Sequence, residues 1–84
     1  MHSRHRATLR AIFTDPAPAS LEWSAIEALL TALGAEVTEG DGSRVRVVLH
    51  GVRAVFHRPH PQKEAKRYLV RAVRDYLIQA GVKP

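Results

Sequence analysis

Two histidines near the end of one stretch of the chain carry side chains suited to acid–base chemistry. Residues 40–60 read GDGSRVRVVLHGVRAVFHRPH, and His57 and His60 lie at its end. Histidine takes and releases a proton near neutral pH, so either side chain is a candidate general base. An exposed histidine without a catalytic role explains the same pattern. Zinc binding is a weaker interpretation, because proline interrupts the His-x-x-His pair and no cysteine is present to complete a site.

Cationic side chains surround these histidines and offer phosphate binding. Each arginine or lysine can neutralise a phosphate, and an arginine can hold one with two hydrogen bonds. The set consists of Arg44, Arg46, Arg53, Arg58, Lys63, Lys66, Arg67, Arg71 and Arg74. A solvated sheet face is the simpler alternative, although exposed arginines on neighbouring strands repel each other unless an anion joins them. We favour a nucleic-acid surface.

The charge of the chain is concentrated in its second half. The net charge of the 84 residues is +5; residues 1–42 carry three arginines against six acids, and residues 43–84 carry ten Lys or Arg against two acids. A small domain with one half this basic usually meets a polyanion or an acidic protein. A charge that only keeps the protein soluble remains the alternative.

Length and composition limit the class of protein. We expect one domain over residues 1–84, because a chain this short cannot build a second core. The absence of cysteine excludes disulfides and thiolate sites and fits a reducing compartment, so we expect a cytoplasmic protein. The basic start is interrupted by Arg10 and followed by Asp15-Pro16, which predicts no signal peptide, and no apolar run reaches membrane-spanning length.

The central stretch predicts a two-stranded hairpin that positions the arginines and histidines. Apolar and polar residues alternate over 44–49 and again over 52–57, the period of half-buried strands. His50-Gly51 between them suits a two-residue turn, since Gly takes positive φ freely. One face then carries Val45, Val47, Leu49, Val52, Ala54 and Phe56, and the other carries Arg44, Arg46, Val48, Arg53, Val55 and His57.

The remaining segments predict one further strand and three helices. We expect helices over residues 3–14, over 24–33 with a Ser24–Glu27 capping box, and from about 63 to 80. A short strand is expected over 35–38. The last helix presents Arg67, Arg71 and Arg74 along one ridge, at i, i+4 and i+7.

These elements predict a two-layer α+β domain in the order α-α-β-β-β-α, with a three-stranded antiparallel sheet packed against helices. Because the hairpin is marginal alone, its apolar face must be covered by the helices. The expected core residues are Trp23, Leu29, Leu33, Val47, Phe56, Leu69, Val73 and Leu77.

Residues 22–82 resemble the HicA family of bacterial toxins, small mRNA interferases that pair with a HicB antitoxin. The resemblance is carried by WSAIEALL at 23–30, Leu33-Gly34-Ala35, Gly42-Ser43, His60 with the following Lys63-Glu64, and Ala80-Gly81-Val82. It implies a fold similar to double-stranded-RNA-binding domains and metal-independent cleavage of RNA. In the family pattern a catalytic histidine directly follows the Gly-Ser pair. Here that position is Arg44, and arginine cannot act as a base.

The resemblance therefore implies an RNA-cleaving toxin whose base lies elsewhere. The candidate catalytic residues are His60 first, His57 second, and Arg44 as a charge stabiliser. Ser43, Arg46, Arg53, Arg58, Lys63, Arg67, Arg71 and Arg74 would contact the RNA. No metal or other cofactor is expected, and the expected partners are mRNA and an acidic HicB-like antitoxin. Two alternatives remain, a catalytically silent RNA-binding module and a subunit whose basic face only docks an acidic partner.

Overall fold

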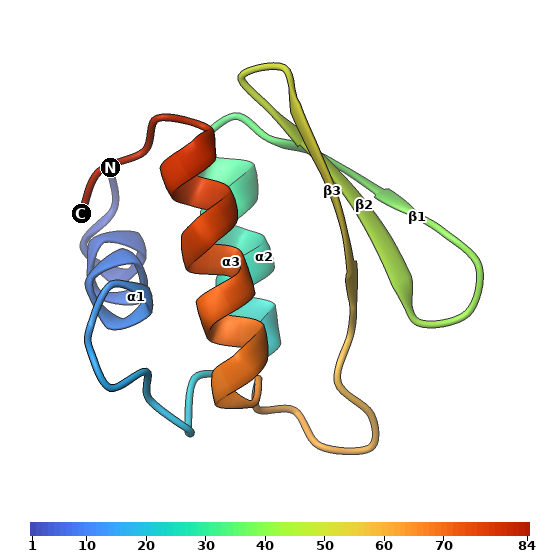
Figure 1. Ribbon diagram of the computed structural model, residues 1–84, viewed down its shortest axis with the longest axis horizontal. Helices are drawn as coiled ribbons and strands as arrows, with labels where there is room; N and C mark the ends of the chain where they lie inside the picture. Colours follow the sequence, from blue (N-terminus) through green and yellow to red (C-terminus); the bar gives the residue numbers. More distant parts are fainter.

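A three-stranded antiparallel sheet with helices packed on one face forms the framework of the protein (Figure 1). The computed structural model describes residues 1–84. Its elements are α1 (Ser3–Ile12), α2 (Trp23–Ala32), β1 (Glu36–Glu39), β2 (Arg44–Leu49), β3 (Val52–His57) and α3 (Arg67–Gln79). The predicted α+β class and the order of the elements are confirmed.

The β2–β3 hairpin has the predicted register and turn. Leu49 pairs with Val52, and the residues between them have the positive φ angles of a primed two-residue turn, 50° at His50 and 78° at Gly51. Val45, Val47 and Leu49 are buried on the helix side, whereas Arg44 and Arg46 on the same strand are exposed. The hairpin therefore separates an apolar inner face from a cationic outer face. Strand β1, which pairs with β2, starts one residue later than expected.

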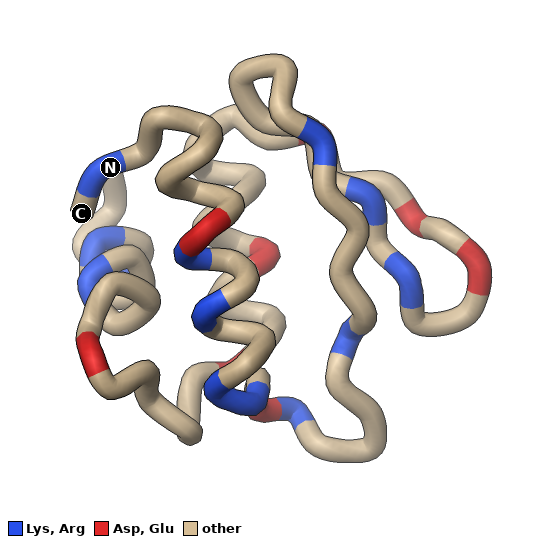
Figure 2. The backbone as a smooth tube through the Cα atoms, viewed as in Figure 1, with Lys and Arg blue, Asp and Glu red and all other residues tan.

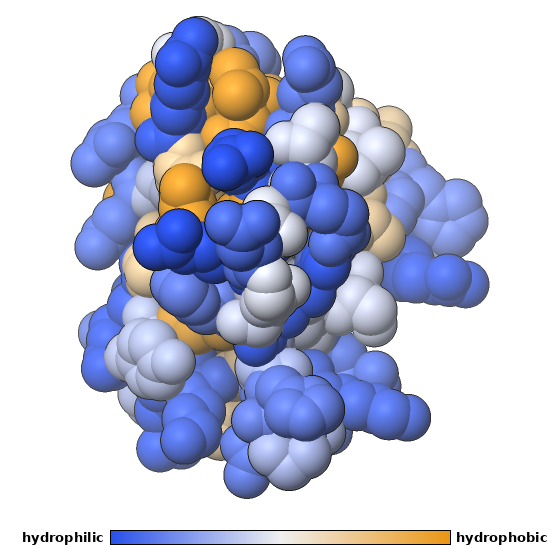
Figure 3. All heavy atoms as spheres, turned by 90° about the vertical axis from the view of Figure 1, so that its right-hand side faces the viewer, coloured by the Kyte–Doolittle hydropathy of each residue, from blue (hydrophilic) through white to orange (hydrophobic).

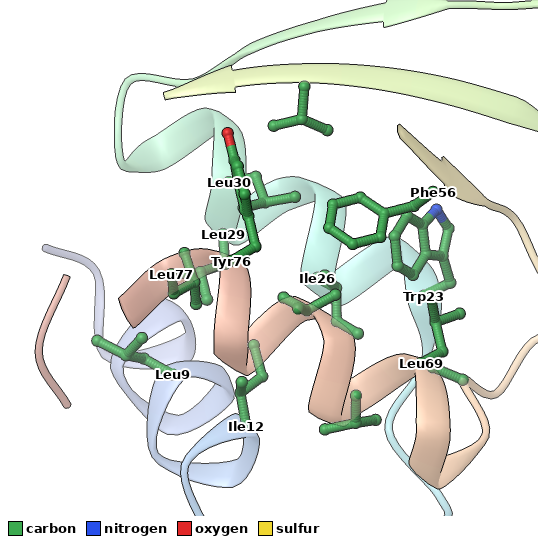
Figure 4. Packing of buried hydrophobic residues seen from close by; sticks show 14 of the residues in the cluster. Leu9, Ile12, Trp23, Ile26, Leu29, Leu30, Phe56, Leu69, Tyr76 and Leu77 are labelled. Carbon is green, nitrogen blue, oxygen red and sulfur yellow. The ribbon is translucent and has the colours of Figure 1, made fainter. Parts of the chain in front are cut away.

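Helices α2 and α3 cover the inner face of the sheet, and α1 packs on their opposite side (Figure 1). The resulting core contains 18 buried hydrophobic residues, which come from every helix, from β2 and β3 and from the segments that flank them. In Figure 4 the ring of Phe56 lies near those of Trp23 and Tyr76, with ring centroids 5.9 and 5.7 Å away. Seven of the eight expected core residues are buried. The exception is Leu33, which is half-buried because it is the C-terminal cap of α2.

The prediction of a Ser24–Glu27 capping box was wrong. Helix α2 has Glu22 as its N-cap, and no side chain caps its first turn. The carboxylate of Glu27 instead accepts hydrogen bonds from the Trp23 indole and the Arg58 guanidinium. Those partners hold the carboxylate away from the backbone N–H that a capping box requires.

The prediction that the last helix starts near residue 63 was also wrong, because α3 starts at Arg67. The preceding residues pair with the segment before α2: Trp23 N–H donates to Lys63 O at 2.9 Å, and Ala65 N–H donates to Leu21 O at 2.8 Å. This pairing holds the backbone before Arg67 in an extended conformation instead of a helix, and it buries Ala65 completely. None of the three helices is long and apolar enough to span a membrane.

Candidate functional site

The outer face of the sheet is a cationic surface. Arg44, Arg46 and Arg53 are exposed on it, and the half-buried Val48 and exposed Val55 lie among them. This face contains a shallow hollow. Its lining residues are Thr38, Arg46, Val47, Val48, Arg53, Ala54 and Val55. Figure 3 shows that hydrophilic side chains cover most of this side of the molecule. The face thus combines positive charge, which could attract phosphates, with the apolar side chains of two valines.

Strand register places Arg44 directly opposite His57 on the outer face. Arg58 N–H donates to Ser43 O at 2.9 Å, which makes Ser43 and Arg58 a hydrogen-bonded pair. Such pairs alternate with non-hydrogen-bonded ones, in which the side chains approach most closely, with Cβ atoms about 4.5–5.5 Å apart. The next pair, Arg44 and His57, is of this closer kind. A fixed positive charge and a titratable imidazole are therefore cross-strand neighbours.

His57 and His60 line one small pocket beyond the end of β3. The pocket has a volume of about 190 Å³, and its wall also includes Lys66, the N-cap of α3, and Tyr68 in the first turn of that helix. That is smaller than the roughly 300 Å³ or more typical of sites that enclose a whole ligand, so it suits part of a larger substrate. His60 also lines an adjoining depression with Ser43. The structure thus brings together both sequence-predicted histidines and Ser43.

Arg58 holds this region in place through two carboxylates. Its guanidinium donates to Glu27 at 2.6 and 3.1 Å and to Glu39 with two bonds of 2.7 Å. These hydrogen bonds raise the pKa of Arg58 and lower the pKa of the Glu39 carboxyl. The network joins α2, the end of β1 and the chain between His57 and His60. The charge of Arg58, a predicted RNA contact, is already neutralised within the protein.

Comparison with protein families assigns the chain to a known group. A family model described as "HicA toxin of bacterial toxin-antitoxin" matches residues 23–82. The chain belongs to the HicA toxin family. Membership implies an antitoxin partner, because the family is defined by toxin–antitoxin pairs. Comparisons with curated proteins and with solved structures gave no significant match.

The part that matches the HicA family runs from the start of α2 to Val82 and includes every residue of the pocket described above. Helix α1 lies outside the matched range. The family match thus covers the sheet, the two helices on its inner face and the loop that carries His60.

The α3 ridge of this HicA family member is largely occupied by internal hydrogen bonds. Arg67 Nε donates to Ala17 O at 2.9 Å, and Arg74 donates to Ile12 O at 2.7 Å and to Thr14 O at 2.6 Å. These bonds fasten α3 to α1 and the α1–α2 linker, on the side away from the sheet (Figure 1). Figure 2 accordingly shows the cations of α3 apart from those of the strands. This structural role of Arg67 and Arg74 could not be predicted from local sequence, because each bond joins residues 50 or more positions apart.

The two remaining predicted RNA contacts, Arg71 and Lys63, are exposed but do not line the pocket. Arg71 is exposed on α3, and Lys63 is exposed in the loop before that helix, beside Trp23 and Pro61. Tyr68 carries no local sequence signal of a functional role, but its place in the first turn of α3 puts it in the wall of the pocket. No group of three or more His, Cys, Asp or Glu side chains is arranged to hold a metal ion.

Proposed function

We propose that this HicA family member is a toxin that cleaves RNA without a metal ion at the pocket formed by His57 and His60. The observation that carries the proposal is the pairing of Arg44 with His57, together with the pocket that His57 shares with His60. The pair places a fixed cation beside a proton acceptor, and the pocket adds a second titratable group. Metal-free cleavage of RNA requires such groups around one phosphate.

The proposed reaction uses the ribose 2′-hydroxyl, which RNA has and DNA lacks. His57 takes the proton from this hydroxyl, and O2′ attacks the adjacent phosphorus. The bond from phosphorus to O5′ breaks as protonated His60 gives its proton to the leaving oxygen. The products are a 2′,3′-cyclic phosphate and a 5′-hydroxyl. Arg44 stabilises the negative charge that develops on the phosphate oxygens.

The exposed arginines of the outer sheet face hold the RNA on either side of this point. Arg46 and Arg53 contact neighbouring phosphates, and Ser43 positions the strand next to His60. We place this activity in the cytoplasm, where mRNA is available. Sequence alone ranked His60 first as the base; the register supports giving that role to His57, because His57 is the residue beside Arg44.

The test is single-turnover cleavage of a labelled RNA in EDTA by the wild type and by the variants His57→Ala and His60→Ala. Each substitution should lower the rate by about 10²–10⁴-fold, the usual contribution of a general acid or base. His5→Ala is the control, because His5 lies on α1, remote from the sheet. Full activity in both pocket variants would reject the assignment.

A catalytically silent RNA-binding module is the second candidate, favoured by Arg44 at the position where the family pattern has histidine. It predicts that the wild type binds RNA with an affinity that falls steeply with salt, as phosphate contacts require, but leaves the strand intact. The same cleavage assay therefore decides between the two candidates.

We further propose that an acidic HicB-like antitoxin covers the outer sheet face. Complementary charge speeds association and selects the partner, and this face is the exposed cationic surface beside the pocket. Arg46→Glu should weaken the binding of RNA and of antitoxin together. Arg10→Glu is the matched control, because Arg10 is an exposed arginine on α1 and was not predicted to contact the RNA. If Arg46→Glu weakened RNA binding while antitoxin affinity stayed constant, the two ligands would use different surfaces. If it weakened only antitoxin binding, the face would serve docking alone.

A further inference from the structure

Tyr68 is the one Phe, Trp or Tyr side chain that is exposed to solvent. Its relative exposure is 64%, whereas Trp23, Phe56 and Tyr76 are buried together in the core. Burying an aromatic ring is among the most favourable contributions to folding, so its exposure next to a pocket indicates a binding role more than a structural one.

The position of Tyr68 is fixed relative to both candidate histidines. It is the second residue of α3, and Leu69 and Val70, which follow it, are buried in the core. Its side chain lines the pocket that also contains His57, His60 and Lys66. Arg44 lies on the other side of His57, across the hairpin. From β2 to α3 the order is therefore the Arg44 guanidinium, the His57 imidazole, the pocket and the Tyr68 ring.

We propose that Tyr68 stacks on an unpaired nucleobase of the RNA, next to the phosphate held between Arg44 and the histidines. This inference rests on the proposed function and identifies its substrate as single-stranded RNA. Unstacked bases of single-stranded RNA bind by stacking on exposed aromatic rings, and any base offers a suitable face. A base stacked on Tyr68 places its own ribose and phosphate at the pocket, which admits only part of a nucleotide. Lys66, beside the ring, neutralises an adjacent phosphate.

The experiment compares Tyr68→Ala and Tyr68→Phe with the wild type. Ile78→Ala is the matched control, because Ile78 is 57% exposed on the same helix but does not line the pocket. Two quantities are measured: affinity for a labelled single-stranded RNA and for a duplex of the same sequence, and the dependence of the single-turnover cleavage rate on enzyme concentration.

Tyr68→Ala should weaken single-stranded RNA binding by about 5- to 150-fold, the range for loss of one base–aromatic stack. The half-saturating concentration for cleavage should rise by a similar factor while the maximal rate changes less, as expected for a contact made before and during the reaction. Tyr68→Phe and Ile78→Ala should behave like the wild type, and duplex affinity should not change.

Three results would overturn the inference. Wild-type affinity in Tyr68→Ala would show that no base stacks there, and an equal loss in Tyr68→Phe would assign the effect to the hydroxyl. If the wild type bound no RNA at all, the proposed function would fail with the inference. If the wild type cleaved RNA and Tyr68→Ala bound it with wild-type affinity, the inference would fail but the proposed function would stand.

Discussion

Phe56→Ala should destabilise the domain more than a change at almost any surface position, because Phe56 joins the sheet to both covering helices. Its ring is 6% exposed and contacts the rings of Trp23 and Tyr76. Replacing a buried phenylalanine by alanine costs about 3–5 kcal/mol. The two aromatic pairs account for about 1–3 kcal/mol of this loss.

The total stability makes this loss easy to measure. A domain of this length has about 4–13 kcal/mol of unfolding free energy. With a urea slope of about 1.5 kcal/mol/M, the unfolding midpoint of Phe56→Ala should fall by about 2–3 M, or the variant should be unfolded without denaturant. The assay is urea denaturation followed by circular dichroism.

Val55→Ala is the matched control, because Val55 is the neighbouring residue on the outer face and is 54% exposed. It should change stability by less than about 0.5 kcal/mol. Equal midpoints for Phe56→Ala and the wild type would contradict the assignment of the core to this face of the sheet.

Two predictions concern the dependence of stability on pH. Burial raises the pKa of the Tyr76 phenol in the folded protein. The contribution of Tyr76 to folding stability is therefore complete below the pKa of the unfolded state, about 10, and is lost as the pH rises through the pKa of the folded state. Tyr76→Phe should remove this alkaline loss in urea titrations from pH 8 upward; an unchanged alkaline slope would contradict it. The hydrogen bonds from Arg58 lower the pKa of Glu39 in the folded protein. The contribution of Glu39 to folding stability is therefore present above the pKa of the unfolded state, about 4.3, and is lost as the pH falls through the pKa of the folded state. Glu39→Gln should make stability less sensitive to acid, measured by unfolding between neutral pH and pH 3, and equal acid sensitivity in both proteins would rule out this role for the ion pair.

The hairpin was predictable because two local signals agree. Alternation fixes which residues of 44–49 face the core, and a strand shifted by one residue would expose Val45, Val47 and Leu49 together. His50-Gly51 fixes the register from the other end, since both residues adopt the positive φ that the turn requires. Given that register, the pairing of Arg44 with His57 follows from the sequence alone.

Tertiary contacts account for what the sequence did not reveal. Ser24 and Glu27 have capping-box spacing, yet Arg58, 31 residues further along the chain, takes the Glu27 carboxylate. Residues 63–66 read as helix, but backbone pairing with the segment before α2 keeps them extended. Arg67 and Arg74 looked like a free ridge and instead bind carbonyl oxygens near α1. Local spacing contains no information about such distant partners.

The candidate site was only partly predictable for the same reason. His57 and His60 attract notice by residue type, but Tyr68 gives no local signal that distinguishes it from a core aromatic. Only the start of α3 at residue 67 leaves that side chain outside the core and beside the histidines.

The most direct test of the central claim is to incubate the wild-type protein with an end-labelled single-stranded RNA in EDTA and to analyse the ends of the fragments. We predict cleavage that leaves 2′,3′-cyclic phosphates and 5′-hydroxyls, with a DNA strand of the same sequence left intact because it lacks the attacking 2′-hydroxyl. An intact RNA strand would contradict the account, as would fragments that form only when a divalent metal ion is added.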